Sequence, residues 1–279
     1  MTADQTSNTG GRALRDREQL MSVIERRAAV LAAVVANAGR SRVVVGLSGG
    51  IDSAVSCGIA VRALGPEAVT AVRLPSRHTE QVHIDDAAAV AQACRLPAGN
   101  LLTISIEPLL EGLERARGVD PRTAPLRFGN ASARCRMILL YDVAQELDAL
   151  VVGTENRSEF LLGYYTRFGD AASDMEPISD LFKTEVRIAA DLLGLPAAVL
   201  DKHPTAGLWG GQTDEQELGF SYDHADRAMA AMVDGRLSPE HAAEHTSVPL
   251  ATVLRVRDRM DMVAWKSTVP HTLHELDLD

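Results

Sequence analysis

An apolar strand that runs through glycines straight into a helix is the feature that most restricts the fold of this chain. Residues 43–47 read Val-Val-Val-Gly-Leu, and Ser48-Gly49-Gly50-Ile51-Asp52-Ser53 follows before an apolar helical pattern. A continuous apolar strand is typical of a parallel sheet that is covered on both faces. Glycines let the backbone approach a ligand closely, and the N–H groups that open a helix favour an anion. The segment therefore predicts an α/β sheet with an anion site at the end of one strand.

Three further runs rich in Val, Ile or Leu repeat the pattern of a buried strand, at 68–74, 100–106 and 149–153. Segments with helical periodicity alternate with these runs, at 52–64, 79–95 and 129–147. Such alternation predicts a doubly wound, mostly parallel sheet with helices on both faces.

The last part of the chain is expected to be helical. Beyond residue 156 the strand signal fades, and glycines mark long connections. Two helices are expected within 238–266, which begins with the helix-start sequence Ser-Pro-Glu. Their short spacing allows either a helix-turn-helix DNA reader or packing onto the domain or a partner subunit, and the acidic chain favours packing. We expect a polar tail over 1–20 and a single domain over 21–279 that ends in these helices.

Charge and cysteine content exclude several classes of protein. The chain has 28 Lys and Arg against 38 Asp and Glu, a net charge of -10, which disfavours broad attraction to nucleic acid or anionic membrane. The longest apolar run, 28–36, is much shorter than the roughly 18 residues of a membrane span, and residues 1–20 lack a signal-peptide core. Cys57, Cys94 and Cys135 lie far apart, which disfavours disulfides and a cysteine-rich zinc site. The expected location is the cytoplasm.

The loop after the first strand has the chemistry of a phosphate site. It lacks the lysine of a Walker A motif, while Ser48 and Ser53 offer hydroxyl donors. The Asp52 carboxylate repels phosphate unless a cation such as Mg²⁺ lies between them. The alternative is an ordinary carboxylate in the first turn of a helix, which the helix dipole favours. The whole run resembles the pyrophosphate loop of N-type ATP pyrophosphatases, enzymes that cleave ATP to AMP and pyrophosphate.

A second dense region, 153–170, begins at the end of the last expected strand. It contains Phe160, Tyr164, Tyr165 and Phe168, whose rings suit a nucleotide, although Phe160 and Tyr164 also have the spacing of a core-filling helix face. Upstream, Arg134 and Arg136 are expected early in a helix, where the dipole disfavours cations. An anionic ligand would compensate for them, as would surface ion pairs.

Together with 181–186 and 204–215, these motifs resemble the synthetase domain of the NAD synthetases over about residues 20–270. The resemblance implies an adenine nucleotide alpha hydrolase-like fold and amidation of nicotinic acid adenine dinucleotide (deamido-NAD) with ATP, Mg²⁺ and ammonia. The products would be NAD, AMP and pyrophosphate, formed through an acyl-adenylate. A homodimer is implied, with deamido-NAD at the subunit interface and ATP at the carboxyl edge of the sheet, and neither nucleic acid nor membrane is an expected partner. The first strand near residue 42 leaves no room before it for a glutaminase domain, so ammonia is the expected nitrogen donor.

The resemblance also assigns roles to individual residues. The expected ATP-binding residues are Gly46, Leu47, Ser48, Gly49, Gly50, Ile51, Asp52, Ser53, Thr154, Lys183 and Thr205. Asp52 and Glu159 are the expected Mg²⁺ ligands. The expected deamido-NAD-binding residues are Arg134, Arg167, Asp174, Trp265 and Lys266, with Trp265 standing where many members have histidine. Asp170 and Lys183 are the expected catalytic residues.

Two alternatives stay open at this stage. The first is another AMP-forming enzyme of the same fold, such as a GMP synthetase-like amidase or a transfer RNA thiolase. The thiolase usually needs working cysteines and a basic face, which this chain lacks. The second is a nucleotide-binding regulator without turnover, against which the intact Asp52, Glu159 and Lys183 argue.

Overall fold

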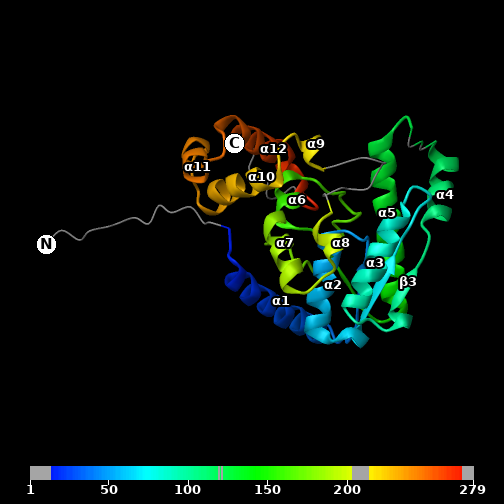
Figure 1. Ribbon diagram of the computed structural model, residues 1–279. Helices are drawn as coiled ribbons and strands as arrows, with labels where there is room; N and C mark the ends of the chain where they lie inside the picture. The colour runs from blue at the N-terminus through cyan, green and yellow to red at the C-terminus, as the bar shows by residue number, and fades with distance from the viewer. Residues whose placement is uncertain (1–13, 119, 121, 203–213, 272–279) are drawn as a thin grey trace.

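The computed structural model describes residues 14–118, 120, 122–202 and 214–271. Its sheet has four parallel strands in the order β3-β2-β1-β4, and helices surround it (Figure 1). The strands are β1 (Val43–Gly46), β2 (Val69–Arg73), β3 (Leu101–Thr103) and β4 (Leu150–Val152). All four predicted strands are confirmed, each shorter than its apolar run. The chain moves from β1 outward to β3 and then returns to the other side of β1, so the strand order reverses between β1 and β4.

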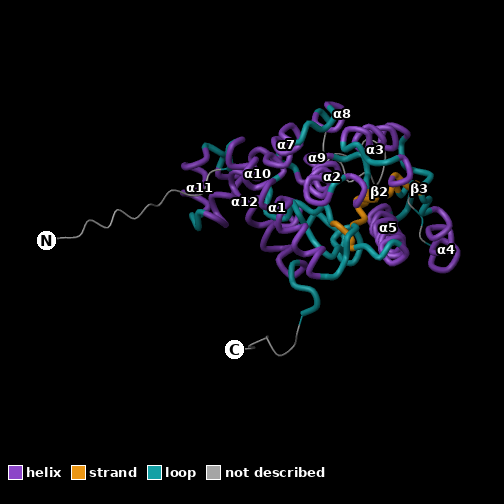
Figure 2. Tube along the Cα trace, turned by 90° about the horizontal axis from the view of Figure 1, so that it is seen from below, coloured by secondary structure: helices purple, strands orange, loops and turns teal. Residues whose placement is uncertain are grey.

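Helices cover both faces of the sheet, as Figure 2 shows with the strands enclosed between them. Val43 and Val45 share a core with α1 (Arg17–Asn37), α2 (Ile51–Leu64), α3 (Gln81–Ala93) and α7 (Lys183–Leu192). Val44, which points to the opposite face, packs with α4 (Glu107–Arg117) and α5 (Pro125–Glu146). The doubly wound α/β architecture is therefore confirmed.

The start of α5 differs from the prediction. The helix begins at Pro125, before the expected residue 129, because proline has its φ already set for the first helical position and has no N–H to leave unpaired there. Arg134 and Arg136 consequently lie in the middle of a 22-residue helix. The prediction that they lie early in a helix is wrong, and the dipole argument does not apply to them.

Most of the remaining helices lie around α7. The remaining helices are α6 (Arg157–Leu162), α8 (Ala197–Leu200), α9 (Asp214–Leu218), α10 (Tyr222–Met229), α11 (Pro239–Thr246) and α12 (Leu250–Val263). A π-helical turn, Ala230–Asp234, continues α10, and 3-10 turns lie at Pro66–Ala68, Ala98–Asn100 and Ala264–Lys266. The two predicted terminal helices are α11 and α12. Val253 and Val256 of α12 are buried in apolar clusters with α10, as packing onto the domain requires.

The N-terminal helix starts inside the range expected for the tail. Asp16 caps α1 by accepting a hydrogen bond from the Gln19 backbone N–H at 2.9 Å, and Leu20 is fully buried. The rest of the expected tail, 1–13, lies outside the described residues. Cys57 lies in α2, Cys135 in α5 and Cys94 at the end of α3; all three are free and buried. Among the described helices, none has the length and apolar character that crossing a membrane requires.

Candidate active site

The candidate site lies at the carboxyl ends of β1 and β4, where the strand order reverses. Open parallel sheets bind ligands in the crevice outside such a reversal. The loop Ser48–Gly50 leads from β1 to α2, with Gly50 as the cap of the helix. Ser53 Oγ accepts from the Ser48 N–H at 3.2 Å and donates to the Gly50 carbonyl at 2.9 Å, while the Gly50 N–H donates to Ser48 Oγ at 3.2 Å. Both predicted hydroxyl donors thus hold the loop in shape.

Backbone conformation and a close neighbour both require glycine at position 49. Its φ is +78°, in the region that favours glycine, and a Cβ placed on it would lie 2.2 Å from the His83 carbonyl oxygen of α3.

Lys202 fixes the same loop from the other side. Its Nζ donates to the Gly49 carbonyl at 3.2 Å and to Asp86 Oδ2 at 2.6 Å, and lies 2.8 Å from His83 Nδ1. Burial and the Lys202 charge lower the pKa of His83, which favours the neutral ring that can accept this contact. Sequence reasoning missed these three residues, because α3 and residue 202 meet only in the folded chain.

The centre of the site is a buried ammonium group. Lys183 opens α7, its side chain is 3% exposed, and its Nζ lies 2.6 Å from Asp52 Oδ2 and 2.9 Å from Glu159 Oε1. Asn156 Nδ2 donates to the other oxygen of Asp52 at 2.8 Å. Asp52, Glu159 and Lys183, all predicted site residues, are therefore brought together. The ammonium lies between the two carboxylates, which the sequence did not reveal.

Electrostatics hold this cluster together. Burial raises the pKa of Glu159, against the attraction of Lys183. Burial alone would lower the pKa of Lys183, but the charges of Asp52 and Glu159 raise it above its ordinary value. Lys183 therefore stays charged at neutral pH. Breaking such a buried pair typically costs about 3–5 kcal/mol, because it leaves a charge without a partner.

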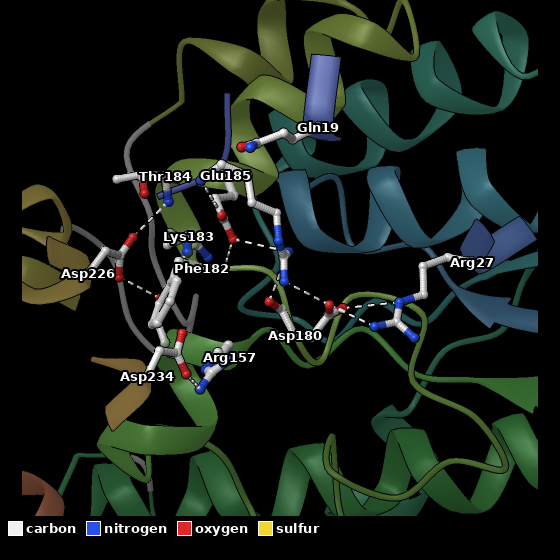
Figure 3. Close-up of polar contacts among 12 residues, drawn as sticks. Gln19, Arg27, Arg157, Asp180, Phe182, Lys183, Thr184, Glu185, Asp226 and Asp234 are labelled. Atoms are coloured by element: carbon white, nitrogen blue, oxygen red, sulfur yellow. Dashed lines mark hydrogen bonds and ion pairs between the residues drawn. The ribbon is translucent and has the colours of Figure 1, made fainter. Parts of the chain in front are cut away.

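A second network fixes the start of α7 (Figure 3). The Lys183 N–H donates to Ser158 Oγ at 2.8 Å, and Ser158 in turn donates to Asp226 Oδ1 at 2.6 Å. Asp226 Oδ2 accepts from the Thr184 N–H at 2.8 Å. Asp226 is fully buried, and burial raises its pKa to about 6. These contacts satisfy backbone N–H groups that the start of a helix leaves unpaired. They also fix the position of Lys183 at the start of α7.

The N-terminal segment is attached to the same helix start. Glu185 Oε2 accepts from the Phe182 N–H at 3.0 Å, and Glu185 Oε1 accepts from the Arg15 N–H at 2.8 Å. Arg15 also reaches Asp180 Oδ2 at 3.0 Å, and Arg27 of α1 forms a second ion pair with Asp180 at 2.6 Å (Figure 3). Residue 15, within the expected tail, is thus part of the packing around the site.

A second acidic group lies beside the end of β4. Glu176 accepts from Ser173 Oγ at 2.7 Å and from the Glu155 N–H at 3.0 Å. A Cβ on Gly153 would lie 1.9 Å from Glu176 Oε1, so the carboxyl group packs directly on the glycine backbone. Burial raises the pKa of Glu155 to about 9 and that of Glu176 to about 7. Neither glutamate was predicted as a site residue.

Four of the predicted deamido-NAD residues gather around the loop 163–170. Arg134 donates to the Arg167 carbonyl at 3.2 Å, and the Arg167 guanidinium lies 5.1 Å from the Trp265 ring centre. Lys266 Nζ donates to the Gly163 and Tyr165 carbonyls, both at 2.6 Å. Trp265 is 56% exposed, so its ring is available to a partner or ligand.

The other predicted residues differ in their distance from this group. Asp174 accepts from the Val151 N–H of β4 at 2.7 Å and from the Tyr141 hydroxyl at 3.5 Å. Asp170 is exposed and accepts from the Thr166 N–H at 2.8 Å, within the 163–170 loop. Thr154 follows β4 and is partly exposed. Thr205 lies outside the described residues.

Comparison with known proteins gives consistent matches. A family model described as NAD synthase matches residues 23–270. The NH3-dependent NAD+ synthetase of Chlorobium phaeovibrioides is 41% identical over 233 residues, which are 83% of this chain and 81% of that one. A solved structure titled NMN synthetase from Francisella tularensis has a TM-score of 0.76 and 33% identity, covering 91% of this chain and 98% of that one. An NH3-dependent NAD synthetase from Campylobacter jejuni has a TM-score of 0.74 and 29% identity, covering 91% and 99%.

Replacing Gly49 by alanine should weaken ATP binding by about tenfold or more, because the new methyl group meets backbone that has little room to move. Gly39→Ala is the matched control: Gly39 has a φ of +70° and nothing within 4 Å of an added Cβ. Both variants carry the cost of a positive φ, about 1–2 kcal/mol of unfolding free energy. Calorimetric ATP titration and urea unfolding separate the two effects, and parental ATP affinity in Gly49→Ala would refute the steric role.

Proposed function

Because the chain belongs to the NAD synthase family, we propose that it amidates nicotinic acid adenine dinucleotide with ATP and ammonia to give NAD. The observation that carries the proposal is the convergence of Asp52, Glu159 and Lys183 beside a glycine loop at the carboxyl edge of the sheet. Relatives that cover most of the chain are named NH3-dependent NAD+ synthetases, which supports ammonia as the nitrogen donor.

The chemistry requires an activated carboxylate. A pyridine carboxylate is a poor electrophile, so its oxygen attacks the α-phosphorus of ATP, which releases pyrophosphate and leaves an acyl-adenylate. Ammonia then attacks the acyl carbon, loses a proton and expels AMP. In the proposed mechanism the N–H groups at the start of α2 and the Lys183 ammonium stabilise the charge that builds up on the phosphates. No covalent enzyme intermediate is needed, in keeping with three buried cysteines.

Mg²⁺ fits the donor set of this site. Asp52 and Glu159 present carboxylate oxygens, the ligands that Mg²⁺ prefers, and Asp214 Oδ1 is buried without a hydrogen-bond partner in the same region. Within the described part of the chain no group of three or more His, Cys, Asp or Glu side chains is arranged to hold a metal. Mg²⁺ is usually held by one or two carboxylates together with substrate phosphates. Two carboxylates are therefore enough for a Mg²⁺ site that is completed by the phosphates of ATP. Asp52 and Glu159 would hold the ion, which supplies positive charge to the phosphates.

The deamido-dinucleotide is proposed to bind Arg134, Arg167, Trp265 and Lys266, which gather around the loop 163–170. Asp170 lies on the same loop and is proposed to act near the reacting carboxyl group. Asp174 is also proposed to bind this substrate, and its carboxylate would do so while it keeps the hydrogen bond from the Val151 N–H. Thr154 and Thr205 remain proposed ATP contacts.

A homodimer is the proposed assembly. Support comes from large apolar side chains that are exposed: Phe160, Phe168 and Trp265 lie at the loop 163–170, and Ile138 lies on α5, the helix that carries Arg134. Isolated exposed apolar residues are common, but several around one loop favour a covered surface. A single synthetase domain and a cytoplasmic location complete the proposal, the latter supported by free thiols.

Purified protein with ATP, Mg²⁺, ammonium and deamido-NAD should form NAD, AMP and pyrophosphate in equal amounts. Chromatography of the products tests this directly. Nicotinic acid mononucleotide should be tested as an alternative substrate, because one solved neighbour is titled NMN synthetase. A preference for the mononucleotide would replace deamido-NAD as the assigned substrate. ADP and phosphate as products, or glutamine as effective as ammonium in a glutaminase-free preparation, would overturn the assignment.

Asp52→Asn and Glu159→Gln should each lower kcat/KM by about 100-fold or more and raise the Mg²⁺ requirement, because each loses a charge that holds the cation. Both replacements preserve size, and Lys183 keeps one carboxylate partner. Asp191→Asn, on the exposed far end of α7, is the control and should match the parent. Activity within about threefold of the parent across a Mg²⁺ titration would rule out the metal role.

Light scattering at micromolar concentration should give the mass of two chains. Ile138→Asp should shift the protein toward monomer, because a charge would replace an apolar contact. Val30→Asp, equally exposed on α1, should leave the mass unchanged. A parent protein that is monomeric and fully active would contradict the proposed dimer.

A further inference from the structure

Arg136 of α5 is a cation that the proposed mechanism does not use. Its Nε donates to the Leu74 carbonyl at 3.1 Å, directly after β2 ends. Among the described residues it forms no ion pair within 4.0 Å, whereas Lys183 has two carboxylate partners. Burial lowers the pKa of Arg136, and the charges of Asp170 and Cys135 only partly oppose this shift. A partly buried guanidinium without a carboxylate partner is costly unless an anion binds to it.

The position of Arg136 follows from its neighbour one helical turn away. Leu140 packs on the last residue of β1, since a Cβ on Gly46 would lie 3.2 Å from Leu140 Cδ1. Residues four apart share one face of a helix, about 6 Å apart along its axis. α5 ends just before β4 begins, so its earlier residues lie toward the carboxyl edge of the sheet. Arg136 therefore lies level with the loop that follows β1.

Two contacts tie this place to the phosphate loop. The Leu47 N–H donates to the Val72 carbonyl at 2.9 Å, which holds the start of the loop beside the end of β2. Arg136 binds the carbonyl of Leu74, two residues further along the same segment. Lys183 and Arg136 thus approach the loop from opposite faces of the sheet, because α7 and α5 belong to the two separate cores.

We propose that the Arg136 guanidinium binds an oxygen of the ATP phosphate chain, opposite Lys183, and so is a further substrate-binding residue of the active site. Arginine suits this task, since its Nε is held by Leu74 while its terminal nitrogens remain to donate to an anion. The inference rests on the proposed function for the identity of the nucleotide.

The test is calorimetric titration with ATP alone, together with steady-state kinetics for both substrates. Arg136→Gln should weaken ATP binding about tenfold or more, and Arg136→Lys by about threefold or more, because lysine cannot hold Leu74 and a phosphate at once. KM for deamido-NAD should stay within about twofold of the parent. Arg127→Gln is the control: Arg127 lies on the same helix, is exposed and donates to the Arg117 carbonyl.

The outcomes separate the possibilities. Unchanged ATP affinity in either Arg136 variant would overturn the proposal, and the lysine variant keeps the test valid if the glutamine variant does not fold. A selective rise in KM for deamido-NAD would assign the guanidinium to the substrate carboxylate, which also contradicts the proposal. A parent protein that binds ATP but makes no NAD would refute the proposed function, while the ATP comparison would still decide the role of Arg136.

Discussion

The ammonium group of Lys183, held between the carboxylates of Asp52 and Glu159, is the interaction on which the site depends. Each of the three residues comes from a different helix, α7, α2 and α6. Since a buried charge needs a partner, this contact requires the start of α7 to lie between the loops that follow β1 and β4. Ser158 and Asp226 secure the arrangement by binding the first backbone N–H groups of α7.

The parallel sheet makes this meeting possible. β1 and β4 are neighbours in the sheet but lie more than a hundred residues apart in the chain. Their carboxyl ends deliver the phosphate loop and the Thr154–Glu159 segment to one place, and Asn156 bridges them by donating to Asp52. Lys202 and His83 then hold the loop from the side of α3. The site is therefore built where strand order reverses, with few residues from regular strands.

Sequence patterns anticipated the parts that depend on local spacing. The apolar runs identified the four strands, and the glycine loop with Asp52 predicted a phosphate site, while Glu159 was assigned through the resemblance. Pairings such as Ser158 with Asp226 and Lys202 with Asp86 have no local signal, because they join residues 68 and 116 positions apart. The start of α5 was missed because Pro125 was not read as a first helical residue. Resemblance named Lys183 as a phosphate ligand, but only the fold revealed that two carboxylates bind it.

Asp52 and Glu159 need the Lys183 ammonium as a shared cation, and urea unfolding of Lys183→Met measures this need. Methionine is similar in length but uncharged, so the variant should lose about 3–5 kcal/mol of unfolding free energy. Adding Asp52→Asn to it should restore much of that loss, because Glu159, whose pKa burial raises, can then take up a proton. A Lys183→Met protein as stable as the parent, with no gain from the second replacement, would show that the two carboxylates do not depend on the ammonium.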